Sequence, residues 1–511
     1  MKHHPQPEQQ SLYSDYFVRN MIPEDHPLLE IDREVDFSFV RELVADLYSP
    51  DVGREALDPE MLLRLCFLQS YYGLSDREVI SRAQTDLAFR VFLHLGVEDA
   101  LPHPTMLTVF RKRLGKRRFE EIFNRSVTVA MDRGLVEGKL VLVDSYGIHA
   151  DVAVPRRRKL LQRIVRQALV EAEDLGIDVT ELRSEQEALL EDDSWTLGKD
   201  LREKDLANWF DLSERVHDTV AAAEVTSQQD ELRQPILHLL SKACERQQRP
   251  KSNERADRIV SDVDPDARWS MRQRGKKAFV GYKEQIATDE KHQIITAAEV
   301  TPGNVDDTTQ LDQLLDGHER NTGQRPEAAA GDSGYSSGAN RAELNERQIT
   351  DYVAPPTPKG HKQGKFSACD FEPDFDDDGT PMRVRCPAGK VASNGKWQQD
   401  RDGWNFYFKK GQCEGCQFRD RCTKSERGRG VFISRYWREH REAWSRRKEP
   451  DFIAAQIARL GIERTFAYKQ RRSGHKRAWY RGLERVGIQV FLSCFMVNVV
   501  RISRARAKMQ C

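Results

Sequence analysis

The sequence lacks a hydrophobic run long enough to span a bilayer, and it lacks an excess of charge of either sign. Its longest apolar run, from Ile488 to Val500, includes Gln489 and Asn498, whereas a membrane-spanning helix needs about 20 apolar residues. We therefore expect a buried helix there, with no membrane partner and no secretory signal. Basic and acidic residues number 81 each, which excludes a uniformly basic or acidic protein.

Cysteine is also scarce, with 9 residues in a chain of 511. Those outside one segment are scattered: Cys66, Cys244, Cys369, Cys494 and Cys511. A secreted disulfide framework would use cysteine more densely, so we expect a reducing, cytoplasmic location. The remaining thiols are Cys386, Cys413, Cys416 and Cys422. One CxxC pair with two further thiols could close a structural Zn²⁺ site; reduced cysteines without metal are the alternative.

The zero net charge hides a strong asymmetry along the chain. Residues 421–511 carry 23 Lys and Arg against 7 Asp and Glu, so the preceding residues carry the matching negative excess. A concentrated basic region predicts an anionic partner at this end of the molecule. A solvated basic face is the alternative.

The N-terminal part is helical in pattern after a polar extension at 1–45. Asp58, Pro59 and Gly73 have the spacing of a helix cap, first turn and stop. Ser75 and Glu78 have capping-box spacing, and a basic amphipathic segment opens at Thr105. Successive helices of this kind predict a helix-turn-helix-like DNA-binding domain at 46–135. Its candidate DNA contacts are Arg111, Lys112 and Arg113. A helical bundle with a solvated basic face is the alternative.

The middle of the chain changes to strand patterns. A buried strand over 140–143 ends at Asp144, an alternating hairpin covers 278–300, and a short strand leads into Asp332. With a helix near 308–318, this order predicts a mixed α/β core at 136–155 and 255–360. A charged helical insert at 156–254 interrupts the core, and a cysteine-bearing insertion at 361–430 follows it.

A family resemblance rests on motifs that occur in one order. These are LDPEMLLRLCFLQSYYG with HPTMLTVFRKRL, then VLVDSYGIHAD, SDVDPDARW with FVGYK, GDSGYSSGANRAEL, and IERTFAYKQRRSGHKRAWYRGLERV. The chain resembles the DDE-type insertion-sequence transposases of bacteria. That resemblance implies an RNase H-like catalytic core, shared with retroviral integrases, whose C-terminal part with basic helices would be residues 431–511.

The resemblance also implies catalytic residues and partners. Asp144, Asp332 and Glu463 match the family's three metal-binding acids, which hold Mg²⁺ or Mn²⁺ for cleavage and strand transfer at phosphodiesters. The implied partner is double-stranded DNA, the transposon ends and the target, bound by a homodimer. A nuclease on the same fold and a domesticated DNA-binding protein without catalysis are the alternatives.

The neighbourhood of Glu463 follows the family pattern only in part. Arg459 has the family spacing to Glu463, and residues four apart share a helix face. Gln456 stands where the family has Tyr, Gln470 stands where it has Lys, and Lys469 lies one position early. The predicted DNA contacts in this region are Arg459, Lys469, Arg471, Arg472, Lys476, Arg477 and Arg481.

Overall fold

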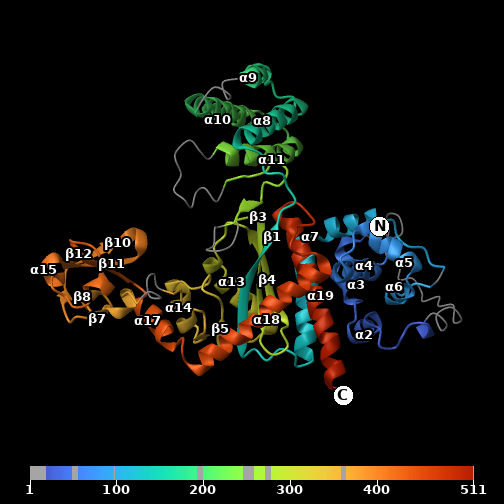
Figure 1. Cartoon of the computed structure of the whole chain (residues 1–511). Coiled ribbons are helices and arrows are strands. Elements are labelled where there is room, and N and C mark those ends of the chain that lie inside the picture. The colour runs from blue at the N-terminus through green and yellow to red at the C-terminus, as the bar shows by residue number, and fades with distance from the viewer. Residues whose placement is uncertain are drawn as a thin grey trace.

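The computed structural model describes residues 19–48, 56–96, 98–192, 199–244, 258–270, 278–357 and 364–509. Within them, a central mixed sheet is surrounded by N-terminal helices, a helical arm and a β-rich unit, which Figure 1 shows at the right, top and left of the sheet. The predicted α/β core with two insertions is therefore the architecture that the chain adopts.

The central sheet has the strand order β4–β3–β1–β5–β6, and β2 adds to β3. Its strands are β1 (Leu140–His149), β2 (Arg268–Trp269), β3 (Val280–Asp289), β4 (Ile295–Pro302), β5 (Ala328–Ala330) and β6 (Thr350–Asp351). Strand β3 is antiparallel to β1, β2 and β4, whereas β5 is parallel to β1 and β6. The predicted hairpin is thus confirmed as β3 and β4.

The sequence predicted that Asp144 ends a strand, but in the structure Asp144 lies within β1. Strand β1 continues to His149, because the residues after Asp144 remain paired with β3 as far as Gly281. What ends near Asp144 is the other ladder: the pairing of β1 with β5 stops at Leu142 and Ala330. Asp144 therefore lies where one edge of β1 has become free.

Helices cover both faces of the sheet. Helix α13 (Leu311–Thr322), which begins close to the predicted position, packs on β3 and β4. On the opposite face, α18 (Pro450–Ser473) packs on β1, and α19 (Leu483–Met509) packs on β4. Because side chains alternate along a strand, Val141 and Val143 join the core under α13, whereas Leu142 and Ile148 join the core under α19. Asp144 accordingly shares the face of α18, and Ser145 shares the face of α13.

The N-terminal helices follow the predicted caps. They are α2 (Pro27–Glu34), α3 (Phe39–Leu43), α4 (Pro59–Tyr72), α5 (Asp76–Thr85), α6 (Leu87–Phe92) and α7 (Thr105–Asp132), with the 3₁₀ turn η1 (Ala45–Leu47). Asp58 caps α4, and Gly73 ends it in the left-handed conformation. Ser75 and Glu78 form the capping box of α5.

Much of the predicted N-terminal extension is part of the core. Residues 1–18 lie outside the described residues, but Phe37 is fully buried, and its ring lies 5.6 Å from those of Phe67 and Phe92 and 5.7 Å from that of Phe495. The few apolar residues before position 45 are separated by charged ones, so their sequence pattern was weak. The boundary placed at 135 is not a boundary between cores either, because α7 packs along α19.

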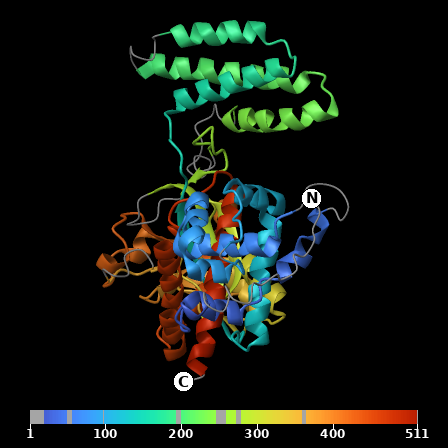
Figure 2. The same cartoon turned by 90° about the vertical axis from the view of Figure 1, so that its right-hand side faces the viewer.

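The charged insert forms the predicted helices. Helices α8 (Arg157–Asp174), α9 (Thr180–Glu191), α10 (Lys199–Ala222) and α11 (Ser227–Cys244) enclose a core of their own around the fully buried Trp209. Figure 2 shows this arm standing above the rest of the molecule.

The cysteine-bearing insertion is a β-rich unit of two sheets. One contains β7 (Glu372–Phe375), β8 (Pro381–Arg385) and β9 (Val391–Ala392), and the other β10 (Gly395–Gln398), β11 (Gly403–Lys409) and β12 (Gly428–Ser434). Its short helical turns are η5 (Ala368–Asp370), η6 (Gln399–Arg401), α15 (Lys410–Cys413) and α16 (Arg419–Cys422). The predicted boundary at 430 is wrong because it cuts β12, which pairs with β11 as far as Ser434. Helix α17 (Trp437–Arg446) then leads to α18.

The apolar C-terminal run is a buried helix, as predicted. The segment Leu483–Ala505 of α19 is long and apolar enough to cross a membrane by length and composition, yet 94% of its apolar window is buried inside the structure. Such burial is typical of the core helix of a folded domain.

Candidate active site

The three predicted acids come from separate elements that meet beside the sheet. Asp144 lies in β1, Asp332 follows β5, and Glu463 lies in α18, which packs on β1. Leu142 pairs with Ala330 in the parallel ladder, so the two aspartates, each two residues further on, lie at the same level. The structure thus brings the three carboxylates together.

Their proximity shows in the electrostatics of Asp144. Burial raises the pKa of Asp144, and the negative charge of Asp332 raises it further, to about 6, against the opposing effect of Arg459. Glu463 adds a smaller contribution in the same direction. A carboxyl group held in this way lacks a full countercharge.

Arg459 bridges two of the acids. Its Nη1 donates to Asp144 Oδ2 at 2.9 Å, and its Nη2 lies 3.8 Å from Glu463 Oε1. The expected proximity of Arg459 and Glu463 on one helix face is therefore confirmed. Asp144 is nearly buried, with 13% of its side chain exposed, whereas Glu463 is 59% exposed. Glu463 consequently stands at the solvent side of the site.

Gln456 has a role that sequence reasoning missed. Its Nε2 donates to the carbonyl oxygens of Gly331 at 3.1 Å and Tyr352 at 2.5 Å, which ties α18 to the residue before Asp332. Its Oε1 accepts from Arg459 Nε at 3.4 Å. The signal was present in the sequence as the departure from the family's Tyr at this position.

A fourth carboxylate, Asp307, also lies at the site. It belongs to the 3₁₀ turn η3 (Asp307–Thr309) and is 5% exposed. Its Oδ1 accepts from Lys283 Nζ at 2.9 Å, and its Oδ2 accepts from the Ser145 hydroxyl at 3.1 Å. The acidic pair at 306–307, four and five residues after the end of β4, was the available signal.

The carboxylates suit a hard divalent metal by their donor chemistry, because Mg²⁺ and Mn²⁺ prefer oxygen ligands. Among the described residues, however, no group of three or more His, Cys, Asp or Glu side chains is assembled closely enough to hold a metal ion. The acids therefore fit a divalent metal by the type of their donor atoms.

Lys469 is not a DNA contact, which corrects the prediction. It is fully buried, forms an ion pair with Glu284 and donates to Cys494 Sγ at 3.3 Å. His475 Nε2 lies 2.8 Å from the other oxygen of Glu284. Burial alone would raise the pKa of Glu284, but Lys469 and His475 lower it to about 2. This charged cluster attaches α18 to β3.

Arg111 is likewise wrong as a DNA contact. It is 5% exposed, because α7 turns it toward α4 and α5, where it donates to Gln69 of α4 at 3.1 Å and pairs with Asp76 of α5 at 2.5 Å. Lys112 is exposed, and the guanidinium of Arg113 lies 5.2 Å from the Tyr48 ring. A DNA-binding role for these last two stays a prediction.

The predicted basic residues after Glu463 are mostly on the surface. Those exposed are Arg471, Lys476, Arg477 and Arg481. Arg472 is half-buried, with its guanidinium 4.8 Å from the Tyr71 ring. The segment pairs with the end of β1, since His149 N donates to Lys476 O at 2.9 Å and Ala478 N donates to His149 O at 2.8 Å. The basic surface therefore lies next to the strand that carries Asp144.

The four clustered cysteines line one small pocket in the β-rich unit: Cys386, Cys413, Cys416 and Cys422. Burial raises the pKa of Cys422, and the three other thiols raise it further against the effect of Arg429. The thiols are thus neighbours, although among the described residues they are not arranged closely enough to hold a metal ion.

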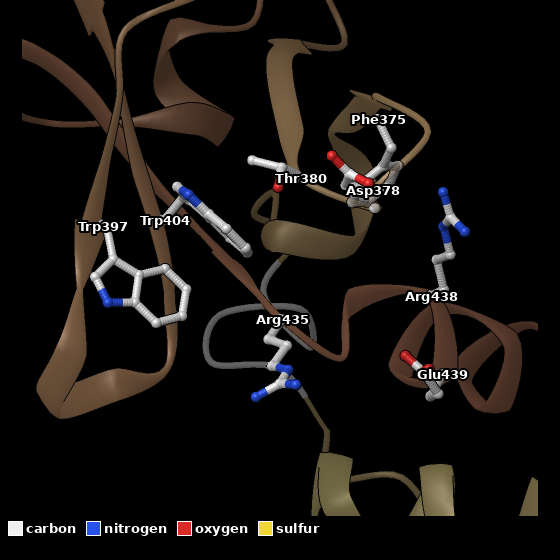
Figure 3. A pocket seen from close by; sticks show the side chains of 9 residues that line it. Phe375, Asp378, Thr380, Trp397, Trp404, Arg435, Arg438 and Glu439 are labelled. Atoms are coloured by element: carbon white, nitrogen blue, oxygen red, sulfur yellow. The ribbon is translucent and has the colours of Figure 1, made fainter. Parts of the chain in front are cut away.

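The same unit has an open cavity of about 610 Å³ (Figure 3). Trp397 and Trp404 line it from β10 and β11, and Arg435 and Arg438 line it from the segment that begins α17. Of the aromatic residues on these strands, Phe406 and Phe408 are buried, whereas Trp397 is 48% exposed.

Comparison with known proteins gives two family matches. Residues 17–113 match the family described as a transposase domain (DUF772), and residues 385–503 match the family described as a transposase DDE domain. The second match includes Glu463, whereas Asp144 and Asp332 lie outside both. The chain is 28% identical over 147 residues to an uncharacterized protein, ORF8 in the nfe locus of Rhizobium meliloti, which covers 27% of this chain and 69% of that protein. No solved structure matches.

Proposed function

We propose that this chain, an insertion-sequence transposase of the DDE type, binds the terminal inverted repeats of its own element and cleaves and joins DNA there in a metal-dependent reaction. The observation that carries the proposal is the convergence of Asp144, Asp332 and Glu463 from β1, β5 and α18. The fold supports an RNase H-like core: three antiparallel strands continue into two parallel ones, with helices on both faces.

The protein's own groups prepare the site for this chemistry. Backbone N–H groups fix the two aspartates, since Ser145 N donates to Asp144 at 2.8 Å and Gly334 N donates to Asp332 at 2.7 Å. The carboxylates of Asp144, Asp332 and the exposed Glu463 would hold Mg²⁺ or Mn²⁺, which supplies activation of a water or a 3′-hydroxyl for attack on a phosphodiester. Arg459 balances the negative charge between Asp144 and Glu463.

The basic surface beside the site supports DNA as the substrate. Arg471, Lys476, Arg477 and Arg481 follow α18 closely and are exposed, and cations in such a position bind backbone phosphates. We propose that they hold the transposon end beside the three acids, and that two copies of the chain do so in a cytoplasmic synaptic complex.

We also propose that the four thiols of the β-rich unit bind Zn²⁺. One support is that the four cysteines line a common pocket. A second is that Cys386 and Cys413 lie in tight turns, since Gly389 and Gly415, with φ of +74° and +67°, follow them within a few residues. Tetrahedral thiolate sites are built from such turns. Zinc would stabilise a unit whose buried core is small.

The substitution Asp332→Asn tests the proposed catalysis. It keeps the size of the side chain and removes a metal-binding charge, so we expect cleavage of end-labelled transposon DNA with Mg²⁺ to fall at least about 100-fold while DNA binding in a gel-shift assay persists. Asp316→Asn, at an acid that is 55% exposed on α13, is the matched control. Cleavage that survives Asp332→Asn would contradict the proposal.

Two further outcomes separate the alternatives. A wild-type chain that cleaves the ends but never joins them to target DNA would be a nuclease. A chain that binds the ends and cleaves nothing would be a DNA-binding protein without catalysis.

A further inference from the structure

The face of the sheet opposite Asp144 carries a buried polar network under the catalytic acids. Its members are Ser145, Lys283, Gln285, Asp307 and Tyr335, here called the Asp307 network. Ser145 and Gln285 are direct neighbours across β1 and β3. Asp307 accepts from Ser145, Lys283 and Gln285, the last at 2.9 Å. Tyr335 donates its hydroxyl to Gln285 Oε1 at 2.5 Å.

The network reaches both catalytic aspartates through the chain. Ser145 is the residue after Asp144, and its backbone N–H also donates to the Asp144 carboxylate. Tyr335 lies in the turn that Asp332 opens, and it is fully buried. One continuous path of hydrogen bonds, Ser145 to Asp307 to Gln285 to Tyr335, therefore joins the two segments that carry the acids.

Asp307 also lies directly beside the Asp332 turn. A Cβ added at Gly334 would lie 2.8 Å from Asp332 Oδ1 and 3.4 Å from Asp307 Oδ2. Both carboxylates therefore lie close to the space that a side chain at position 334 would occupy. Lys283, which also donates to the carbonyl oxygen of Val305 at 2.8 Å, supplies the countercharge that a buried Asp307 requires.

The charges fix the direction of these hydrogen bonds. Burial raises the pKa of Tyr335, and the negative charges of Asp307, Asp144 and Asp332 raise it further. The phenol consequently stays protonated and donates to Gln285, which orients the Gln285 amide N–H toward Asp307.

We propose that Asp307 is a positioning residue that sets the separation of Asp144 and Asp332 for divalent-metal binding, acting through Ser145 on one side and through Gln285 and Tyr335 on the other. The inference rests on the proposed function. Residues that orient metal ligands in this way govern metal affinity without touching the metal.

The test removes single hydroxyl groups from the two ends of the network. Ser145→Ala and Tyr335→Phe, in the full chain, each remove one hydroxyl group and leave the Lys283–Asp307 ion pair in place. We expect each variant to raise the Kd for Mn²⁺, measured by electron paramagnetic resonance of free Mn²⁺, about tenfold. The Mn²⁺ concentration for half-maximal cleavage should rise in the same ratio, and the rate should recover at saturating Mn²⁺.

Asp307→Asn and Asp306→Asn form a matched pair of charge substitutions, one inside the network and one beside it. Asp307→Asn leaves Lys283 as an unpaired buried cation, and we expect it to weaken Mn²⁺ binding at least as strongly as the hydroxyl deletions. Asp306→Asn changes the adjacent, exposed acid and retains an oxygen that can accept from Thr308 N, so its Mn²⁺ affinity should equal that of the wild type.

The outcomes separate this inference from the proposed function. If Ser145→Ala and Tyr335→Phe bind Mn²⁺ as the wild type does, whatever their melting temperatures, the network does not position the two aspartates for the metal and the inference is overturned. If the wild type shows no Mn²⁺ binding that Asp332→Asn abolishes, the proposed function fails, and the inference fails with it.

Discussion

At the scale of single residues, Gly73 shows how closely the N-terminal helices approach α18. It has φ of +68°, and a Cβ added there would lie 2.5 Å from the carbonyl oxygen of Arg472. That oxygen belongs to the backbone of α18 and cannot move aside cheaply. Glycine is therefore required at position 73 both for the positive φ and for the close contact with the carbonyl oxygen of Arg472.

The substitution Gly73→Ala should lower the free energy of unfolding by about 2–3 kcal/mol, because backbone strain adds to the clash. Gly134→Ala is the matched control, since Gly134 has φ of +66° with nothing within 4 Å, and it should cost only about 1 kcal/mol. Urea unfolding of both variants measures the difference. Equal losses would show that the contact with Arg472 contributes nothing.

His318 gives the stability a pH dependence. It is fully buried between α13 and the sheet, with Nδ1 2.8 Å from the Thr296 hydroxyl, and burial lowers its pKa to about 4. Between pH 6.5 and 4 the unfolded chain binds this proton and the folded chain does not, so stability falls as the pH drops through this window. The loss should be about 3 kcal/mol.

The comparison of wild type with His318→Asn isolates this effect. The wild type should lose more stability than the variant between pH 7 and pH 5 in urea unfolding, and the difference should vanish between pH 7 and pH 8. The Glu284 carboxylate, whose pKa is lowered, contributes stability that is lost only as the pH falls below about 4.5. Identical pH profiles of the two proteins would refute the assignment.

At the scale of elements, the cluster of Glu284, Lys469 and His475 sets how α18 sits on the sheet. Its members come from β3, α18 and the segment after α18. The same helix carries Glu463 on its exposed side, so α18 links the cluster to Glu463.

Glu284→Gln should destabilise the protein by about 3–5 kcal/mol, because it leaves Lys469 as a buried cation without its partner. The double variant Glu284→Gln/Lys469→Met should lose less than the sum of the two single losses, since it removes both charges together. Thermal unfolding of the four proteins in this cycle measures the coupling. Strictly additive losses would show that the pair does not interact.

The β-rich unit is an element-scale case in which a metal is expected to substitute for a core. Purified protein should contain about one Zn²⁺ per chain by mass spectrometry, and Cys413→Ser should lose it and melt earlier. Cys369→Ser, at a thiol outside the pocket lining, should retain it. A wild type without zinc would leave the thiols as reduced cysteines.

At the scale of the whole molecule, the basic surface after α18 predicts how DNA binding responds to salt. Lys476→Ala with Arg481→Ala should weaken binding to transposon ends and reduce the slope of log affinity against log salt by about 1–2. Arg166→Ala, an exposed cation of the arm, should change neither. If Lys476→Ala with Arg481→Ala left the slope unchanged, these side chains would not contact DNA and the surface would only be solvated.

The sequence predicted what depends on local pattern. The caps at Asp58 and Ser75, the hairpin of β3 and β4 and the buried run of α19 all follow from spacing or hydrophobicity. Arg111 and Lys469 look like surface cations in the sequence, and only the packing of their helices shows that they are buried against carboxylates. Asp307 was missed for the same reason, because its partners are distant in the chain.

The ring contact between Phe37 and Phe495 has a consequence for synthesis. The helices that begin the chain acquire their full core only after α19 has left the ribosome, because α19 supplies one wall of it. An N-terminal fragment released early would expose that apolar surface, so it should be a target for proteolysis. Folding of the N-terminal helices is thereby coupled to synthesis of α19.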